Sequence, residues 1–207
     1  MKISYYLSIL ILFTFVSFTS LKAQTVASAV EKVRSPEVGS TIPEVSLIDI
    51  KGTTTSLSNL ISGKKAVIVL YRGGWCPYCT AQMSGLAKVK DEIIAMGYQI
   101  IGVTGEDVAQ ASKFSEDKEL PYKIYTDNGL MLAKKLGVTY QVDNETIKKY
   151  KGYGISIAGG ILPVPTLLVV NETGKLSYVY SNPDYTVRLS SKELIDVLKS
   201  QTITDSE

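Results

Sequence analysis

Residues 72–79 read RGGWCPYC, and this stretch decides the fold because it joins a buried strand to a helix. The preceding residues 66–71 are apolar throughout, which is typical of a central strand covered on both faces. Pro77 suits the first position of a helix, where its missing N–H leaves no hydrogen bond unmade. From Cys79 onward an apolar residue recurs every three or four positions, until Gly97 ends the pattern. The sequence therefore predicts a strand, a C-x-x-C motif and a helix in direct succession.

Strands and helices alternate along the rest of the chain. We expect strands at residues 45–50, 53–55, 66–71, 98–103, 123–125, 166–170 and 176–180. We expect helices at residues 58–61, 77–96, 107–115, 129–136, 144–150 and 190–198. This order predicts an α/β fold with a sheet covered on both faces. The glycine-rich segment 138–162 is the least regular, and we expect an excursion over the site there instead of a second domain.

The N-terminus has the pattern of a secretory signal peptide. Lys2 precedes an apolar stretch at residues 3–18, and Ala23 offers a small residue for cleavage. We therefore expect an exported protein, periplasmic or otherwise extracytoplasmic after cleavage near Ala23. The alternative is an uncleaved membrane anchor, although the apolar run is shorter than the roughly 20 residues of a membrane span. The expected division is a signal peptide at 1–23, a mobile lead-in at 24–40, a single domain at 41–200 and a tail at 201–207.

Composition excludes several classes of function. The 207 residues include two cysteines and no histidine, and the formal net charge is +2. Without histidine, mechanisms that need a Ser-His-Asp triad, a Cys-His pair or a histidine zinc site are excluded. The near-neutral charge leaves no electrostatic footprint for nucleic acid. We expect neither a metal nor another cofactor.

The two cysteines carry the chemistry that the sequence predicts. Cys76 stands where the free N–H groups of a helix N-terminus stabilise an anion, which lowers a thiol pKa and makes the sulfur a nucleophile. Cys79 follows about one turn later and can resolve a mixed disulfide. Trp75 would shield one side, and Arg72 would favour the thiolate. Half of a zinc site and an inert structural disulfide are the alternatives, but no further cysteine or histidine completes a metal set, and so short a loop stabilises little.

A second signal is the proline before the strand at 166–170. Pro165 is a candidate cis-proline beside the cysteines, which would expose the backbone of Val164 for pairing with a substrate, next to Thr166. Because cis X-Pro bonds are uncommon, position alone makes this a weak signal. Pro163 is an alternative, and both prolines could be trans at the start of a strand.

Several stretches of the sequence resemble the thioredoxin superfamily, and most closely its AhpC/TSA branch of peroxiredoxin-like proteins (redoxins). They are residues 38–43 with the following hairpin, 71–79, 125–129 with 136–138, and 163–166. The resemblance covers about residues 37–200. It implies a thioredoxin fold with an N-terminal β-hairpin extension and a central mixed sheet flanked by helices. It also implies that Cys76 attacks, that Cys79 resolves and that Pro165 is the cis-proline.

The chain departs from the family pattern where a peroxide is activated. A typical peroxiredoxin carries a Pro-x-x-x-Thr/Ser-x-x-Cys loop and a later Arg that polarise the peroxide. Here Val69 and Gly73 stand at the Pro and Thr/Ser positions, and Pro165 stands where the later Arg is expected. Arg72 is a candidate substitute. The buried carboxylate of thioredoxin, six residues before the first cysteine, is Leu70 here, so water or another group must accept the proton.

Two enzymatic hypotheses follow, and one that is not enzymatic. The first is an extracytoplasmic thiol–disulfide oxidoreductase that exchanges electrons through the Cys76–Cys79 pair with protein or small-molecule thiols and disulfides. The second is a thiol-dependent peroxidase, in which Cys76 reduces hydroperoxides through a sulfenic acid. Either would need an electron donor, which the sequence does not identify. The third is a binding module with inert cysteines.

Weaker features concern the surroundings of the cysteines. Tyr140, Tyr150 and Tyr153 could line a substrate groove. More often, however, such tyrosines are half-buried residues that pack with their rings and expose the hydroxyl to water. Glu106 and Asp107 follow the strand at 98–103. They could accept a proton, but capping the next helix is the simpler interpretation.

Overall fold

The computed structural model describes residues 26–127 and 129–204, with side chains described as far as Gln201. The signal peptide predicted at residues 1–23 lies outside the described residues, together with its cleavage point near Ala23 and the end of the predicted tail. Within the described ranges, no helix has both the length and the apolar character that crossing a membrane requires.

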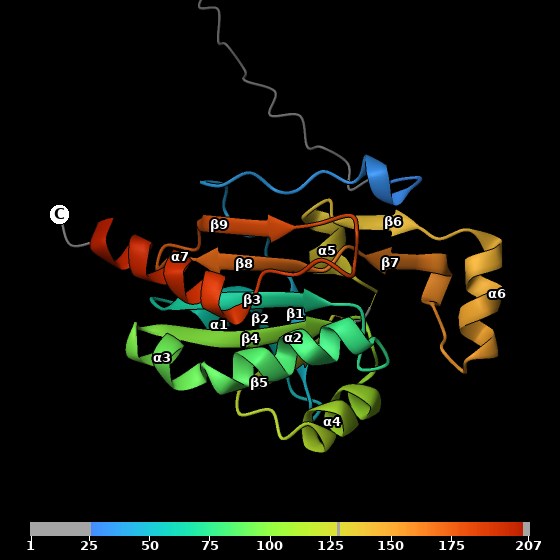
Figure 1. Cartoon of the computed structure of the whole chain (residues 1–207), viewed down its shortest axis with the longest axis horizontal. Coiled ribbons are helices and arrows are strands. Elements are labelled where there is room, and N and C mark those ends of the chain that lie inside the picture. Colours follow the sequence, from blue (N-terminus) through green and yellow to red (C-terminus); the bar gives the residue numbers. More distant parts are fainter. Residues whose placement is uncertain (1–25, 128, 205–207) are drawn as a thin grey trace, which may run out of the picture.

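A seven-stranded mixed sheet forms the centre of the molecule (Figure 1). In spatial order its strands are β2 (Thr54–Ser56), β1 (Ser46–Asp49), β5 (Lys123–Thr126), β4 (Tyr98–Thr104), β3 (Lys65–Tyr71), β8 (Thr166–Val170) and β9 (Leu176–Ser181). β3, β4 and β5 are parallel, and the other neighbouring pairs are antiparallel. The predicted α/β class with a central mixed sheet is therefore confirmed, and the β1–β2 hairpin extends the sheet beyond β5.

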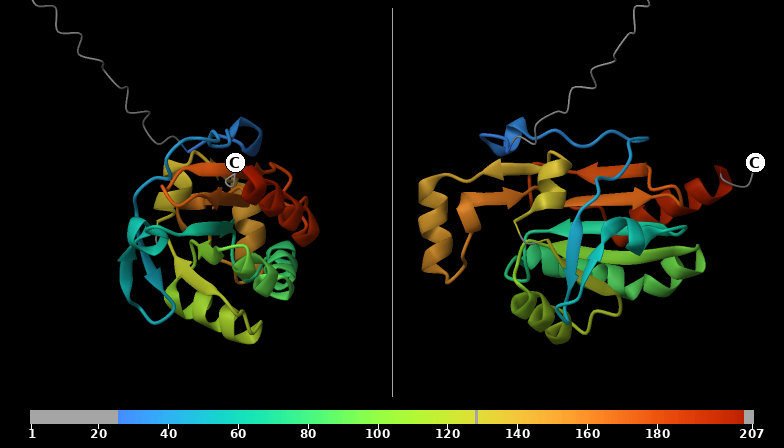
Figure 2. Two further views of the ribbon diagram at one scale, coloured as in Figure 1. Left: turned by 90° about the vertical axis from the view of Figure 1, so that its left-hand side faces the viewer. Right: turned by 180° about the vertical axis from the view of Figure 1, so that it is seen from behind.

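Helices cover both faces of this sheet (Figure 2). One face carries α2 (Pro77–Lys88), α3 (Lys90–Ala95), α4 (Val108–Asp117) and α7 (Ser191–Thr204), and the other carries α1 (Leu57–Ile61) and α5 (Met131–Lys135). The side chains of β3 alternate between two apolar clusters, because successive residues of a strand point to opposite faces. Tyr71 joins both cysteines in the cluster beneath α2, whereas Leu70 lies in the opposite cluster.

The helix predicted at residues 77–96 is in fact two helices. Val89, between α2 and α3, has φ −109° and ψ 9°, which lies outside the helical region. Its N–H bonds to the carbonyls of Leu86 and Ala87, which tightens the end of α2. The apolar pattern continues across the break because Met83 and Ile93 both face the same cluster. Periodicity alone therefore could not reveal the break.

The irregular segment folds into an excursion at the end of the sheet where β3 finishes (Figure 1). It contains β6 (Thr139–Gln141), α6 (Asn144–Gly152), the short 3-10 helix η2 (Ala158–Gly160) and β7 (Ile161–Pro163), and β6 pairs with β7. The predicted helix at 144–150 is confirmed, whereas the three-residue strands are too short to show a periodic pattern.

The predicted lead-in also makes specific contacts where it is described. The Ala27 N–H donates to the Thr139 carbonyl at 2.9 Å, and the Ala27 carbonyl accepts from the Gln141 N–H at 2.8 Å. A 3-10 helix, η1 (Val30–Lys32), follows. This part of the lead-in therefore contacts β6, and the mobility that we expect from its composition stays a prediction.

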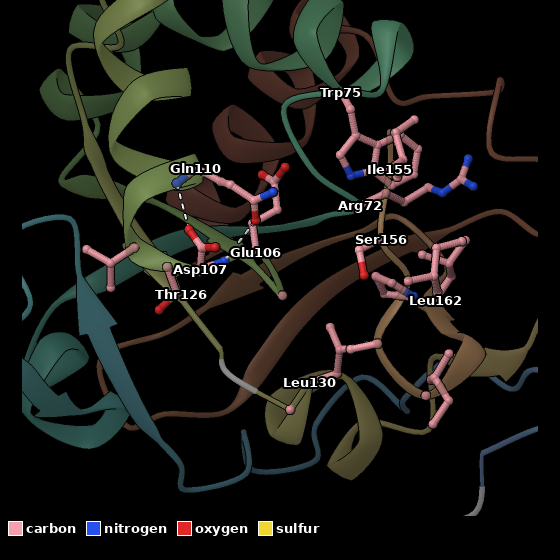
Figure 3. Close-up of a pocket in the computed structure, with 18 of the residues that line it drawn as sticks. Arg72, Trp75, Glu106, Asp107, Gln110, Thr126, Leu130, Ile155, Ser156 and Leu162 are labelled. Atoms are coloured by element: carbon pink, nitrogen blue, oxygen red, sulfur yellow. Dashed lines mark hydrogen bonds between the residues drawn. The ribbon is translucent and has the colours of Figure 1, made fainter. Parts of the chain in front are cut away.

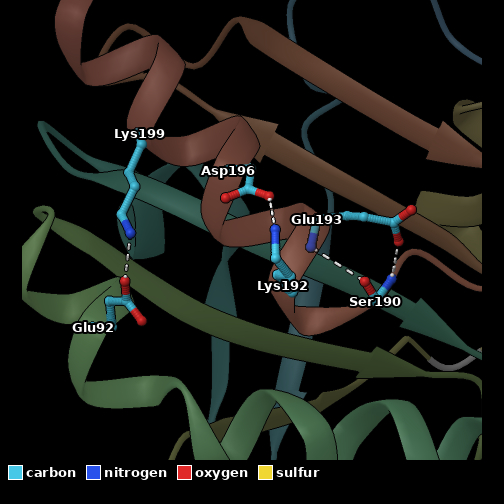
Figure 4. Close-up of polar contacts among 6 residues, drawn as sticks. All are labelled: Glu92, Ser190, Lys192, Glu193, Asp196 and Lys199. Atoms are coloured by element: carbon cyan, nitrogen blue, oxygen red, sulfur yellow. Dashed lines mark hydrogen bonds and ion pairs between the residues drawn. The ribbon is translucent and has the colours of Figure 1, made fainter.

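The C-terminal helix begins at a predicted capping box (Figure 4). The Glu193 N–H donates to Ser190 Oγ at 3.2 Å, and the Ser190 N–H donates to Glu193 Oε2 at 2.8 Å. α7 runs to Thr204, beyond the end expected near residue 198. An ion pair between Lys199 and Glu92, at 2.9 Å, links it to α3; such exposed pairs contribute about 1 kcal/mol or less.

Candidate functional site

The two cysteines lie where α2 begins, directly beyond β3. Cys76 is the N-cap residue and Pro77 is the first residue of the helix, as the sequence predicts. The sulfurs are not joined in a disulfide, and the side chains are 1% and 0% exposed for Cys76 and Cys79. The free N–H groups at the helix N-terminus favour a negative charge on Cys76.

The two sulfurs have opposite proton affinities. Hydrogen bonds from the Cys79 thiol and the Cys79 N–H, with the charges of Arg72 and Arg188, lower the pKa of Cys76 to about 6 against the cost of burial. The pKa of Cys79 is raised, because its thiol proton is held by the Cys76 sulfur, and because burial and the Cys76 charge disfavour a second anion. The pair therefore consists of one thiolate and one thiol near neutral pH.

Arg72 lies within a cage of aromatic rings, and its positive charge acts on Cys76. Its guanidinium carbon lies 4.3 Å from the ring centre of Tyr185, 5.1 Å from that of Trp75 and 5.6 Å from that of Tyr150. Arg72 Nη2 also donates to the Tyr150 hydroxyl at 2.6 Å. The side chain is only 5% exposed. Tyr150 comes from α6, so the excursion lies over the site as expected.

Arg188 is a second cation at the pair, and our sequence analysis does not identify it. Its Nη2 lies 3.6 Å from Cys79 Sγ, and its Nη1 lies 3.4 Å from Gln82 Oε1. Arg188 stands in the irregular stretch between β9 and α7, 109 residues from Cys79. No local sequence motif predicts this role for Arg188. The residue reaches α2 only because β9 runs antiparallel beside β8 and carries the chain back to the start of that helix.

The cis-proline prediction is wrong. Among the described residues no peptide bond is cis, so Pro165 is trans. The backbone of Val164 is also not free to pair with a substrate. The Val164 N–H donates to the Val138 carbonyl at 2.8 Å, and the Val164 carbonyl accepts from Thr166 Oγ1 at 2.9 Å. Both backbone groups of Val164 already have partners inside the protein, while Thr166 pairs with Leu70 at the end of β3.

Gly73 has a structural reason to be glycine. Its φ of +150° is rarely adopted by other residues, and a Cβ there would lie 2.3 Å from Trp75 Nε1 and 2.8 Å from Glu106 Cδ. Glu106 Oε2 accepts a hydrogen bond from the Gly74 N–H at 2.8 Å. The space of the usual Thr/Ser side chain is thus taken by an indole and a carboxyl group. Asp107, and not Glu106, caps the N-terminus of α4, because its side chain accepts a hydrogen bond from the Gln110 N–H.

Two cavities flank the Arg72 side chain. The larger, of about 860 Å³, lies between the end of β4 and the excursion and is lined by Trp75 and Glu106 (Figure 3). The smaller, of about 430 Å³, is lined by Tyr140, Tyr150 and Tyr185. Tyr153 borders the larger cavity. Among the described residues no cluster of three or more potential metal ligands occurs.

Relatives of the chain are named as peroxiredoxins. Chloroplastic peroxiredoxin Q of Triticum aestivum is 28% identical over 144 residues, which cover 70% of this chain and 58% of that protein. Peroxiredoxin bcp1 of Schizosaccharomyces pombe is 34% identical over 102 residues, which cover 49% of this chain and 52% of that protein. The chain spans 58% of the length of the peroxiredoxin Q relatives from wheat and rice.

Solved structures share the fold. Reduced Prx3 of Vibrio vulnificus, determined in complex with hydrogen peroxide, superposes with a TM-score of 0.67. It is 17% identical, and the match covers 78% of this chain and 98% of that chain. The thioredoxin-like fold that the resemblance implies is therefore confirmed. A model of the AhpC/TSA family matches residues 38–179, well over half of the chain, and the protein accordingly belongs to the AhpC/TSA family.

Proposed function

We propose that the protein is a thiol-dependent peroxidase that reduces hydroperoxides through Cys76. The observation that carries this proposal is the place of Cys76 at the N-cap of α2, with Cys79 one turn further on and Arg188 Nη2 3.6 Å from the Cys79 sulfur. These surroundings lower the pKa of Cys76 to about 6, and the thiolate is the reactive form of cysteine. The peroxiredoxin names of the relatives agree with this choice. They favour the peroxidase over the thiol–disulfide oxidoreductase that we place first from the C-x-x-C motif alone.

The reaction uses both sulfurs in turn. The Cys76 thiolate attacks one peroxide oxygen, the O–O bond breaks, and the leaving alkoxide or hydroxide takes up a proton as an alcohol or water. Cys76 is then a sulfenic acid. The Cys79 sulfur attacks it, loses its proton, and forms a disulfide as water leaves. A thiol reductant, oxidised to its own disulfide, returns both cysteines to the reduced state.

Two arginines stand in for the missing peroxide-binding residues in this scheme. The usual Thr/Ser is Gly73 and the usual later Arg is Pro165. Arg72 and Arg188 instead bring positive charge to the sulfurs. This charge would stabilise the negative charge that moves from the Cys76 sulfur to the leaving oxygen as the O–O bond breaks. Because Cys76 is 1% exposed, the residues that cover it must move to admit a hydroperoxide, and the cage around Arg72 is the candidate that we propose.

Stopped-flow oxidation of the reduced protein tests the proposal. Wild type should react with hydrogen peroxide or cumene hydroperoxide far faster than a free thiol at pH 7. Cys76→Ser should not react, whereas Cys79→Ser should react and stop at the sulfenic acid, which a dimedone probe captures. Oxidation of wild type at the rate of a free thiol would exclude the peroxidase.

The thiol–disulfide oxidoreductase remains the second candidate, because Cys79 donates its thiol proton to the Cys76 thiolate. Such a pair can accept electrons from a dithiol and pass them to a disulfide. Reduction of insulin disulfides, lost in Cys76→Ser, would favour this function. Inert cysteines in both assays would favour the binding module.

We also propose that the protein is exported and cleaved near Ala23, as its N-terminal sequence predicts. Fractionation of producing cells, with N-terminal sequencing of the mature chain, tests this. A chain that begins at Gln24 in the extracytoplasmic fraction is the expected result. An intact N-terminus in the membrane fraction would support the anchored alternative instead.

A further inference from the structure

Arg72 is a buried cation without a carboxylate partner. Its side chain is 5% exposed, and no Asp or Glu among the described residues forms an ion pair with it. Within the same part of the chain its guanidinium group donates one hydrogen bond, from Nη2 to the Tyr150 hydroxyl at 2.6 Å. Its Nε is buried and has no partner there. Because a buried charge is normally paired, this arrangement calls for an anion that the described residues do not supply.

The guanidinium group has its free N–H groups at the wall of the smaller cavity. Two rings of its cage, those of Tyr150 and Tyr185, line this cavity together with Arg72. Figure 3 shows the guanidinium group directed away from Glu106, which lines the larger cavity. We therefore place the missing anion in the smaller cavity. Its volume of about 430 Å³ lies within the range of sites for small molecules.

The smaller cavity lies beside the loop that carries Cys76. Trp75 immediately precedes Cys76, and the ring centre of Trp75 lies 5.2 Å from that of Tyr150. Tyr78 follows two residues after Cys76, and its ring centre lies 5.8 Å from that of Tyr185. The rings on both sides of Cys76 therefore contact the walls of the cavity, so a molecule held there is a candidate reactant of the cysteine pair.

The other charged residues of the smaller cavity are two acids. Glu31 comes from η1, and its carboxylate has neither an ion pair nor a hydrogen bond in the described structure. Asp143 stands before α6, where its side chain accepts a hydrogen bond from the Thr146 N–H at 2.8 Å. A purely anionic ligand would meet both acids as well as Arg72. A ligand with a carboxylate and an ammonium group matches all three charges.

The redox cycle indicates which reactant uses this site. In the reduced protein the charge of Arg72 acts on the Cys76 thiolate. A disulfide between Cys76 and Cys79 carries no charge, so oxidation leaves the buried guanidinium group without that anion. The oxidised protein is therefore the form in which an external carboxylate is most favoured, and the molecule that reacts with the oxidised form is the reductant.

We propose that the smaller cavity binds a small amino-acid thiol, cysteine or a short cysteine peptide, as the reductant of the Cys76–Cys79 disulfide. Its carboxylate pairs with Arg72, and its ammonium group lies towards Glu31 and Asp143. This inference rests on the proposed redox function of the cysteine pair, and it names the class of the electron donor.

The exchange needs two molecules of thiol. The thiolate of the first attacks the Cys76 sulfur, the Cys76–Cys79 bond breaks, and the Cys79 sulfur leaves with the electron pair and takes up a proton. A second thiolate attacks the ligand sulfur of the mixed disulfide, which releases the small disulfide and restores the Cys76 thiolate. Because Cys76 is 1% exposed, the first attack needs the same movement of covering residues as the entry of a hydroperoxide.

Three small thiols test the two charges separately. Cysteamine is cysteine without the carboxylate, and 3-mercaptopropionate is cysteine without the ammonium group. The protein disulfide is formed beforehand with diamide, and its reduction by each thiol is followed by acid quenching, alkylation and mass spectrometry. The readout is the ratio of two rate constants measured on one variant. Differences in intrinsic thiol reactivity, and any shared effect of a substitution on the sulfurs, cancel when such ratios are compared between variants.

Arg72→Met should lower the cysteine-over-cysteamine ratio at least about tenfold, the size expected for a hydrogen bond to a charged group. Arg188→Met removes the other arginine at the sulfurs, and Lys134→Met removes the other cation that lines the larger cavity. Both should change the rates with cysteine and cysteamine alike and keep the ratio of wild type.

Glu31→Gln should lower the cysteine-over-3-mercaptopropionate ratio about two- to fivefold, because exposed ion pairs contribute little. Glu145→Gln is the matched control, since this acid lies on α6 but does not line the cavity. It should keep the ratio of wild type. An equal ratio in wild type and Glu31→Gln would overturn the assignment of an amino-acid thiol.

Competition on the wild-type protein tests the site without any substitution. Alanine, which is cysteine without its sulfur, should slow reduction by cysteine, whereas ethylamine at the same concentration should not. An equal effect of the two, or no effect of either, would overturn the proposal. So would an unchanged cysteine-over-cysteamine ratio in Arg72→Met or an equal fall in Arg188→Met. A fall in Lys134→Met would place the carboxylate in the larger cavity instead. Failure of the peroxidase proposal gives a different result, because slow oxidation by peroxide leaves the reduction of the preformed disulfide measurable.

Discussion

Replacing Cys79 by alanine should raise the pKa of Cys76, whereas replacing it by serine should not. The largest contribution that lowers the pKa of Cys76 to about 6 is the hydrogen bond from the Cys79 thiol. Serine keeps a hydroxyl donor at nearly the same place, and alanine removes it. Both variants leave a single cysteine, so any thiol reagent reports Cys76 alone.

The size of the effect follows from the type of hydrogen bond. A hydrogen bond to a charged group contributes about 1.5–3 kcal/mol, and about 1.4 kcal/mol corresponds to one pKa unit. The Cys76 pKa should therefore rise to about 7–8 in Cys79→Ala. At pH 7 the thiolate fraction would fall from about nine-tenths to between about one-half and one-tenth, and alkylation would slow about two- to tenfold.

The assay is the pH dependence of alkylation by iodoacetamide, with thiolate absorbance near 240 nm as an independent reading. The quantity compared is the pH at the midpoint of the alkylation profile and not the rate itself, because the closed cage slows the reagent equally in both variants. Midpoints that agree within about 0.3 pH units would refute the reasoning. The helix N-terminus and the arginines would then be the source of the lowered pKa.

Three further predictions concern the cage, the loop and the thiolate. Tyr150→Phe removes the 2.6 Å hydrogen bond to Arg72 and should open the cage more often, which should raise the rate of Cys76 alkylation about fivefold at unchanged midpoint. Gly73→Thr should destabilise the protein by about 2 kcal/mol or more in urea unfolding and should not speed peroxide reduction, since Trp75 and Glu106 occupy the space. The Cys76 pKa of about 6 lies below the value of about 8.5 in an unfolded chain, so the unfolded state binds more protons between these values. In the Cys79→Ser background, the free energy of unfolding should therefore rise with pH across this interval, by up to about 3 kcal/mol relative to a variant that also carries Cys76→Ser.

Local signals are sufficient for the part of the site that is contiguous in the chain. The apolar run before residue 72, the proline at the first helical position and the spacing of the cysteines predict the strand, the helix and the place of both sulfurs. The capping residues Asp107 and Ser190 are confirmed for the same reason, because a cap and its partner are three residues apart.

The rest of the site depends on contacts between distant segments. Arg188 reaches Cys79 only because β9 returns beside β8, and Tyr150 reaches Arg72 only because the excursion folds back. Pro165 is trans, contrary to our prediction, and the pairing of Val164 with Val138 could not be read from the residues around Pro165. Such contacts have no period or motif in the sequence.

The position of Arg72 between the two cavities has a consequence for the order of events. One side chain forms part of the wall of both spaces, so neither can widen at that wall without narrowing or rearranging the other. An oxidant in one cavity and a reductant in the other would be separated by the Arg72 side chain alone at that wall. For the two-stage electron transfer that we propose, this shared wall would favour alternate over simultaneous occupancy of the two cavities.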